Sequence, residues 1–195
     1  AMDYDRFGQS VAIDKDTIAV GGDLFLVRAN QEGEDRGAVY VFERNEGGEG
    51  NWGEVTKLTA SDATDGDFFG QSVAINGDII VVGAPWKDDT GRNRGAVYVF
   101  ERNEGGEGNW GEATKLTASD AMDNDMFGQS VDIRGDTIVV GGDNREDETE
   151  LWAAYVFERN EGGEGNWGEA TKLTASDAMD NDSWICSVAI SGDIL

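Results

Sequence analysis

The 195-residue sequence contains no histidine, a single cysteine and a single proline. The absence of histidine removes the most common general base and the most common transition-metal ligand in proteins. The single cysteine, Cys186, excludes an internal disulfide, and it stands where the corresponding motifs elsewhere in the chain have glutamine. We therefore interpret Cys186 as a packed apolar substitute and not as a reactive thiol.

The sequence also has little positive charge and no long apolar run. No apolar stretch of about 18 residues is present, so we expect no membrane span, and no signal peptide is visible at Ala1. The 40 acidic and 15 basic residues give a formal net charge of −25. Such a charge repels nucleic acid and anionic membranes, attracts cations and fits a salty or calcium-containing exterior, although a solvated acidic surface explains it without any specific cation site. We expect an extracellular or cell-surface protein with no nucleic-acid partner.

What the sequence does contain is repetition. The stretch YVFERNEGGEGNWGE recurs unchanged, at 40–54, 98–112 and 155–169. A second motif recurs with small changes, as FGQSVAI at 7–13 and 69–75, FGQSVDI at 127–133 and a degraded WICSVAI at 184–190. An enzyme places each catalytic residue once, so verbatim repetition indicates an architectural unit.

Each repeated unit predicts four short strands and no helix. In the second unit the predicted strands are SVAI at 72–75, DIIVVG at 78–83, GAVYVFER at 95–102 and WGEATKLTA at 110–118. They are rich in β-branched and aromatic residues and bounded by Gly, Asn and Asp. Asn76-Gly77 predicts a two-residue hairpin turn, and the glycine-rich RNEGGEGN predicts a longer hairpin loop. No stretch shows the 3.6-residue apolar period of a helix.

The predicted fold class is therefore all-β. A four-stranded antiparallel sheet of this size cannot bury both faces alone, whereas four-stranded blades arranged around an axis can, as in a β-propeller. An open β-solenoid is the alternative, but the hairpins within each unit favour the propeller. We expect aromatic side chains to fill the space between neighbouring blades, namely Phe42, Trp52, Phe100, Trp110, Phe157 and Trp167.

The repeats divide a single propeller array into about three and a half blades. We place three blades at about 7–61, 69–119 and 127–176, and a partial blade at 184–195. Closed propellers have about four to eight blades. We therefore expect a piece of a longer array, or a chain whose ring or filament is completed by other copies, because an isolated half-ring would expose sheet edges and blade faces.

Four motifs carry a resemblance to a known family. DxFGQSVAI, GDIIVVGAP, GAVYVF and WxExxKLTASD resemble the FG-GAP repeat, the blade unit of integrin alpha-subunit propellers and many bacterial surface proteins. Phe69-Gly70 and Gly83-Ala84-Pro85 match both name-giving motifs, whereas Gly21-Gly22-Asp23 and Gly141-Gly142-Asp143 replace the second and Trp184-Ile185 replaces the first. The resemblance covers nearly the whole chain and implies an integrin-like β-propeller that acts in cell adhesion.

The connections between the second and third strands differ from unit to unit. They read LFLVRANQEGED at 24–35, WKDDTGRN at 86–93 and NREDETEL at 144–151. Variation on a constant frame is how a scaffold acquires specificity, although unselected loop drift produces the same variation. We predict that a protein or glycan ligand binds at this end of the blades, through Arg28, Trp86, Lys87, Arg92, Arg94 and Arg145.

The connections between blades lie at the same end and read SDATDGD, SDAMDND and SDAMDND. Carboxylates at alternating positions offer the hard oxygen ligands that calcium prefers. Alternatively, these side chains accept hydrogen bonds from their own loop backbone. The candidate calcium ligands are Asp62, Asp65, Asp67, Asp120, Asp123, Asp125, Asp177, Asp180 and Asp182. The integrin-type calcium loop lies between the first two strands of a blade, a connection that shrinks here to Asn76-Gly77.

Arg134-Gly135-Asp136 spells the tripeptide that many integrins recognise. The aligned positions read Asn76-Gly77-Asp78 and Ser191-Gly192-Asp193, so the Gly-Asp pair belongs to the hairpin and we interpret the tripeptide as a coincidence.

No singular acid/base pair is present, and GGEG lacks the Lys-Ser/Thr and helix of a phosphate loop, so we expect no enzyme activity. Three function classes stay open: an adhesion or ligand-binding scaffold, a structural element that assembles through its blades, and a propeller enzyme that uses acidic residues.

Overall fold

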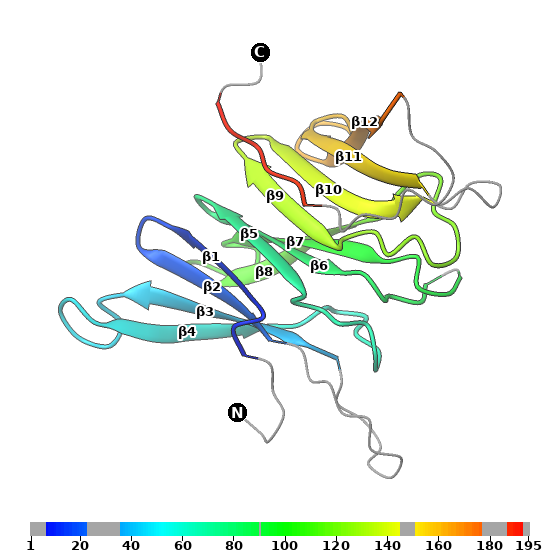
Figure 1. The fold of residues 1–195 in the computed structure, drawn as a ribbon. Helices are drawn as coiled ribbons and strands as arrows, with labels where there is room; N and C mark the ends of the chain where they lie inside the picture. The colour runs from blue at the N-terminus through cyan, green and yellow to red at the C-terminus, as the bar shows by residue number, and fades with distance from the viewer. Residues whose placement is uncertain (1–6, 23–35, 90, 145–150, 177–186, 193–195) are drawn as a thin grey trace, which may run out of the picture.

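The computed structural model describes residues 7–22, 36–89, 91–144, 151–176 and 187–192. These residues form twelve strands in three four-stranded antiparallel sheets, and no helix (Figure 1). We call the sheets blades 1, 2 and 3. Blade 1 contains β1 (Ser10–Asp14), β2 (Thr17–Gly22), β3 (Ala38–Arg44) and β4 (Trp52–Leu58). Blade 2 contains β5 (Ser72–Asn76), β6 (Ile79–Ala84), β7 (Ala96–Arg102) and β8 (Trp110–Leu116). Blade 3 contains β9 (Ser130–Arg134), β10 (Thr137–Asn144), β11 (Leu151–Arg159) and β12 (Trp167–Thr174).

The strands of each blade follow one another in chain order, so every neighbouring pair is joined directly. This confirms the all-β prediction and the four-stranded antiparallel unit. The first strands of the blades, β1, β5 and β9, lie side by side, and the sheets fan out from them (Figure 1). Residues 187–192 continue this series along β9, where the Ile190 N–H donates to Asp132 Oδ2 over 2.7 Å. In the described residues the three sheets do not close into a ring.

The hairpin between the first two strands is shifted by one residue from the prediction. Asn76 pairs with Ile79, so the turn residues are Gly77 and Asp78, not Asn76 and Gly77. Gly77 takes a left-handed φ of 60°, which glycine adopts without a steric penalty. The Arg102 Nε–H donates to Asp78 Oδ1 over 2.9 Å, and this contact with the third strand fixes the aspartate within the turn.

The verbatim loop between the third and fourth strands is closed by its two asparagines. In blade 2 the Asn103 N–H donates to the Asn109 carbonyl over 2.6 Å, and the Gly108 N–H donates to Asn103 Oδ1 over 2.8 Å. Asn103 has a φ of 78°, a left-handed conformation that asparagine tolerates better than most residues. The same bonds recur at Asn45 and Asn160, which explains why the loop sequence recurs unchanged.

The apolar core lies between the blades and not within a single sheet. Blade 1 contributes Ala19, Val39, Val41, Leu58 and Ala60 to the first cluster, and blade 2 contributes Phe69, Val73, Ile75, Ile80, Val82, Ala84, Ala96, Tyr98, Phe100 and Trp110. A second cluster joins blades 2 and 3 in the same way and contains Phe127, Tyr155, Phe157 and Trp167. The predicted inter-blade role of Phe100, Trp110, Phe157 and Trp167 is therefore confirmed.

The Phe-Gly turn that begins blade 2 packs against the backbone of blade 1. Gly37 of blade 1 forms an isolated parallel bridge with Phe69 of blade 2, and the Ser10 hydroxyl donates to the Gly70 carbonyl over 2.7 Å. A Cβ at Gly21 would lie 2.1 Å from the Gly70 oxygen, far closer than real Cβ atoms approach. Glycine at the end of the second strand therefore lets the Phe-Gly turn of the next blade pack directly against the backbone.

Candidate functional site

The variable connection of blade 2 lies against the next inter-blade connection. In blade 2 the loop carbonyls accept backbone bonds from the following connection: Asn124 N–H donates to Arg92, Met126 N–H to Asn93 and Phe127 N–H to Arg94, over 2.7, 3.0 and 3.1 Å. Both kinds of loop therefore share one end of the blades, as strand alternation predicts. We call this end the loop end.

The first aspartate of each of the two described inter-blade connections reaches across to the following blade. The Tyr98 hydroxyl donates to Asp62 Oδ1 over 2.6 Å and Lys115 Nζ donates to Asp62 Oδ2 over 2.7 Å. Burial alone would raise the pKa of the Asp62 carboxyl, but the bonds from Lys115 and Tyr98 and the nearby lysine charges outweigh it and lower the pKa. The first aspartate thus joins consecutive blades.

Blade 3 repeats this arrangement. Tyr155 donates to Asp120 Oδ1 over 3.0 Å, and Lys172 donates to Asp120 Oδ2. The pKa of Asp120 is also lowered, because these donors outweigh the effect of burial. Burial, together with the adjacent Asp120 carboxylate, raises the pKa of the Tyr155 hydroxyl, so this hydroxyl stays protonated and donates.

In both described connections the second aspartate pairs with an arginine that follows the variable loop. Arg36 Nε lies 3.1 Å from Asp65 Oδ1, and Arg94 Nε lies 2.9 Å from Asp123 Oδ1. These pairs are exposed, so each contributes about 0–1 kcal/mol to stability. They hold the end of the variable loop against the neighbouring connection.

The third aspartate is buried inside its own connection. Asp67 accepts from the Thr64 N–H and the Thr64 hydroxyl, each over 2.7 Å, and from Lys87 Nζ over 2.9 Å. Lys87 also donates to the Asp62 carbonyl over 2.6 Å. An ammonium group therefore lies among oxygen ligands at the centre of this loop. The corresponding Asp125 accepts from the Met122 N–H over 2.6 Å.

The predicted calcium ligands that the structure describes thus have protein partners of three different kinds. Within the described ranges, no group of three or more acidic or cysteine side chains lies close enough together to hold a metal ion. Asp177, Asp180 and Asp182 lie outside the described residues. The alternative, in which the aspartates accept hydrogen bonds from their own loop, fits Asp67 and Asp125. Calcium binding stays a prediction.

The predicted ligand-binding residues fall into distinct environments. Trp86 is partly exposed and its ring centroid lies 5.4 Å from that of Phe68, whereas Lys87 is buried by the contacts described above. Arg92 and Arg94 lie on the loop that contacts Asp123. Arg28 and Arg145 lie outside the described residues. Of the predicted ligand-binding residues, Trp86, Arg92 and Arg94 thus lie in the connection between the second and third strands of blade 2. Ligand binding there stays a prediction.

A second candidate region is the side of blade 1 that faces away from blade 2, which we call the outer face of blade 1. Val11 and Ile13 on β1 are 66% and 62% exposed, whereas Val73 and Ile75, their counterparts in an identical motif, are each 9% exposed. Phe7 is likewise exposed and its counterpart Phe69 is fully buried. The same motif is therefore buried at 69–75, where it contacts blade 1, and exposed at 7–13 among the described residues.

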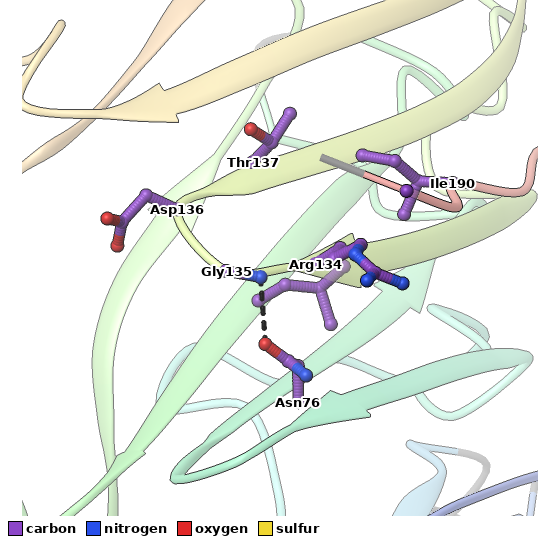
Figure 2. Close-up of a pocket in the computed structure, with 8 residues that line it drawn as sticks. Asn76, Arg134, Gly135, Asp136, Thr137 and Ile190 are labelled. Atoms are coloured by element: carbon purple, nitrogen blue, oxygen red, sulfur yellow. Dashed lines mark hydrogen bonds between the residues drawn. The ribbon is translucent and has the colours of Figure 1, made fainter. Parts of the chain in front are cut away.

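The hairpin of blade 3 borders a hollow of about 630 Å³. Figure 2 shows its lining, in which the Gly135 N–H donates to Asn76 Oδ1 over 2.8 Å. Asp136 pairs with Arg159 at 3.3 Å, as Asp16 and Asp78 pair with arginines in the other hairpins. The aspartate of Arg134-Gly135-Asp136 therefore has the same structural role in all three blades, whereas the glycine is replaced by Lys15 in blade 1.

The repeated contacts agree with the match to a family model. The FG-GAP repeat model matches residues 1–42, 52–100, 110–157 and 167–195. The chain belongs to the FG-GAP repeat family. Each complete match begins at the fourth strand of one blade and ends at the third strand of the next, so the FG-GAP unit spans the boundary between blades. No curated protein matches the chain closely enough to count as a relative.

The FG-GAP chain has no helix of sufficient length and apolar character to cross a membrane among its described residues.

Proposed function

We propose that the chain is a non-enzymatic β-propeller module of an extracellular or cell-surface protein, which binds a protein or glycan ligand through its variable loops. The proposal is supported by the way in which the variable loop of blade 2 is held at the loop end. The connection at 86–93 differs in sequence from its counterparts, yet backbone bonds and the Arg94–Asp123 pair attach it to a constant frame. A fixed frame that presents different loops is the arrangement of a binding scaffold.

Trp86 and Arg92 are the residues through which we expect the loop of blade 2 to contact a ligand. An exposed aromatic ring and a guanidinium group on the same loop offer a stacking surface and hydrogen-bond donors, as binding hot spots commonly do. The partners of the aspartates support a non-enzymatic role. Asp62 and Asp120 each accept a hydrogen bond from the equivalent tyrosine of the next blade, and Asp67 pairs with Lys87.

A binding screen on loop-swapped chains tests this proposal. The chain is applied to glycan and matrix-protein arrays, alone and with residues 86–93 replaced by glycine and serine at every position except Lys87, which is kept because it is buried against Asp67. The matched control replaces 104–108, in the verbatim loop at the opposite end. Loss of binding only in the 86–93 variant supports the proposal, whereas equal binding by both variants, or no binding by the unmodified chain, contradicts it. Repeating the screen with a calcium chelator tests whether calcium contributes.

A second function is supported by apolar side chains that are exposed on blades 1 and 3 in the described part of the chain. The outer face of blade 1 exposes Phe7, Val11 and Ile13, and Leu173 of blade 3 is 53% exposed, whereas its counterpart Leu116 is 5% exposed. Further blades, from the same or other copies, would cover both surfaces and complete a propeller ring or a filament. Ordered rings or polymers in electron micrographs, with no ligand found in the screen, would favour this structural role over the binding role.

A further inference from the structure

The first inter-blade connection surrounds a buried ammonium group with oxygen atoms. Among the described residues, Lys87 is the only buried lysine or arginine. Its Nζ donates to the Asp62 carbonyl over 2.6 Å, to Asp67 Oδ2 over 2.9 Å and to the Thr64 hydroxyl over 3.3 Å. An ammonium group has three protons, so these three oxygens give each proton an acceptor. We call the three oxygens the ammonium cage.

A single negative charge balances the cation in this cage. Asp67 is buried, with 3% of its side chain exposed, and its two carboxylate oxygens also accept from Thr64. Asp62 Oδ2 lies 3.9 Å from Lys87 Nζ, but that carboxylate already accepts from a tyrosine and a lysine of the following blade. Removing the ammonium group would therefore leave one buried carboxylate without compensation, so the cage matches a cation of charge +1.

The dimensions of the cage fit an ammonium group and not calcium. The three oxygens lie 2.6, 2.9 and 3.3 Å from the nitrogen, close to the usual lengths of N–H···O hydrogen bonds. Calcium takes about six to eight oxygen ligands at about 2.3–2.6 Å. Three oxygens at longer distances, with one uncompensated charge, therefore favour a primary ammonium group.

The second inter-blade connection lacks one oxygen of the cage. Met122 stands where the first connection has Thr64, so the hydroxyl acceptor is missing. The residue aligned with Lys87 is Arg145, which lies outside the described residues. The cage is thus a feature of the first connection and not of the common repeat.

The lysine that fills the cage also lies at the base of the variable loop of blade 2. The Lys87 carbonyl accepts from the Gly95 N–H over 3.1 Å, and this bond closes the loop. The Trp86 N–H donates to the Asp67 carbonyl over 3.4 Å, so the residue before Lys87 is bound to the same connection. A cation in the cage therefore holds both sides of the loop base against the connection.

We propose that the first inter-blade connection is a binding site for a primary ammonium group, that Lys87 supplies this group from within the chain, and that the bound group fixes the variable loop of blade 2. The site is independent of both proposed functions, because it needs neither a ligand at the loop end nor a further blade. Calcium is excluded from the cage as long as Lys87 occupies it.

Chemical rescue of a truncated lysine tests the proposal. Lys87→Ala removes the last three carbons and the ammonium group, so propylammonium has the shape of the missing part. The variant is expected to melt about 6–12 °C below the unmodified chain. At about ten times its Kd, propylammonium is expected to raise that melting temperature by about 3–6 °C. Propan-1-ol, which lacks the charge, and sodium chloride at the same concentration are expected to produce no such rise.

Amide hydrogen exchange shows whether the ammonium group acts on the loop. Exchange of the Trp86 and Gly95 N–H groups is expected to be faster in K87A and to become slow again with propylammonium. Calcium is expected to leave both rates unchanged in the unmodified chain. The matched control is K87A/D67A, which has the space but not the carboxylate, so propylammonium should not rescue it.

The remaining outcomes separate the ammonium site from other roles of Lys87. Rescue of K87A by calcium and not by propylammonium would indicate a divalent-cation site and overturn the proposal. Equal rescue of K87A and K87A/D67A would overturn it too, because propylammonium would then only fill apolar space. A folded K87A that nothing rescues would also contradict it. If K87A does not fold, K87M takes its place: faster exchange at Trp86 and Gly95 supports the proposal, and unchanged exchange overturns it.

Discussion

Replacing Lys87 with methionine should lower the free energy of unfolding by about 3 kcal/mol. Lys87 and Asp67 are each 3% exposed at the side chain and lie 2.9 Å apart. Removing one member of a buried ion pair typically costs about 3–5 kcal/mol, because the other charge is left without compensation. Asp67 keeps its two bonds from Thr64, so we expect the lower end of this range.

Urea unfolding followed by tryptophan fluorescence measures this effect. The matched control is Lys115→Met, which removes a cross-blade pair whose lysine side chain is 23% exposed and should cost about 1 kcal/mol or less. In the double variant K87M/D67N, neither buried charge remains, so its cost should be smaller than the sum of the single costs by about 0.5–3 kcal/mol. A K87M chain within about 0.5 kcal/mol of the unmodified chain would refute this reasoning.

Two further substitutions test the contacts between blades. Gly83→Ala should lower the free energy of unfolding in urea by at least about 1–3 kcal/mol, because the new Cβ would lie 2.1 Å from the Gly128 oxygen; an unchanged midpoint would show that the blades are not in direct backbone contact. Asp62→Asn should reduce the loss of stability in acid. The pKa of Asp62 is lowered in the folded chain, so its stabilisation is present above its unfolded pKa of about 3.9 and is lost as the pH falls through the folded value. Melting temperatures between about pH 2 and pH 6 measure this, and equal slopes for both chains would contradict the assignment.

The repeated sequence was sufficient to predict the strands and their order, because β-branched and aromatic residues recur between glycine-rich turns. The hairpin turn was displaced by one residue because Asp78 is fixed by Arg102, 24 residues further along the chain. A pattern of neighbouring residues does not predict a contact between residues so far apart in the sequence. Whether the blades close into a ring could not be predicted either, since closure depends on surfaces outside any one repeat.

The candidate site could be predicted only in part. Strand alternation was sufficient to place the variable loops and the inter-blade connections at one end. The partners of each aspartate could not be predicted, because Tyr98 and Lys115 lie 36 and 53 residues from Asp62 and in another blade. Lys87 resembles an ordinary surface lysine in the sequence, since lysine is rarely buried unless paired, and only the fold shows that Asp67 lies beside it.

The account depends on the claim that each blade hides its apolar side only against another blade, and a comparison of Val11→Ala with Val73→Ala tests this claim most directly. Both residues lie in the same heptapeptide FGQSVAI, so local strand propensity is matched and only the presence of a neighbouring blade differs. In urea unfolding we expect Val73→Ala to cost about 1–3 kcal/mol and Val11→Ala to change stability by less than about 0.5 kcal/mol. Equal costs at the two positions would contradict the account.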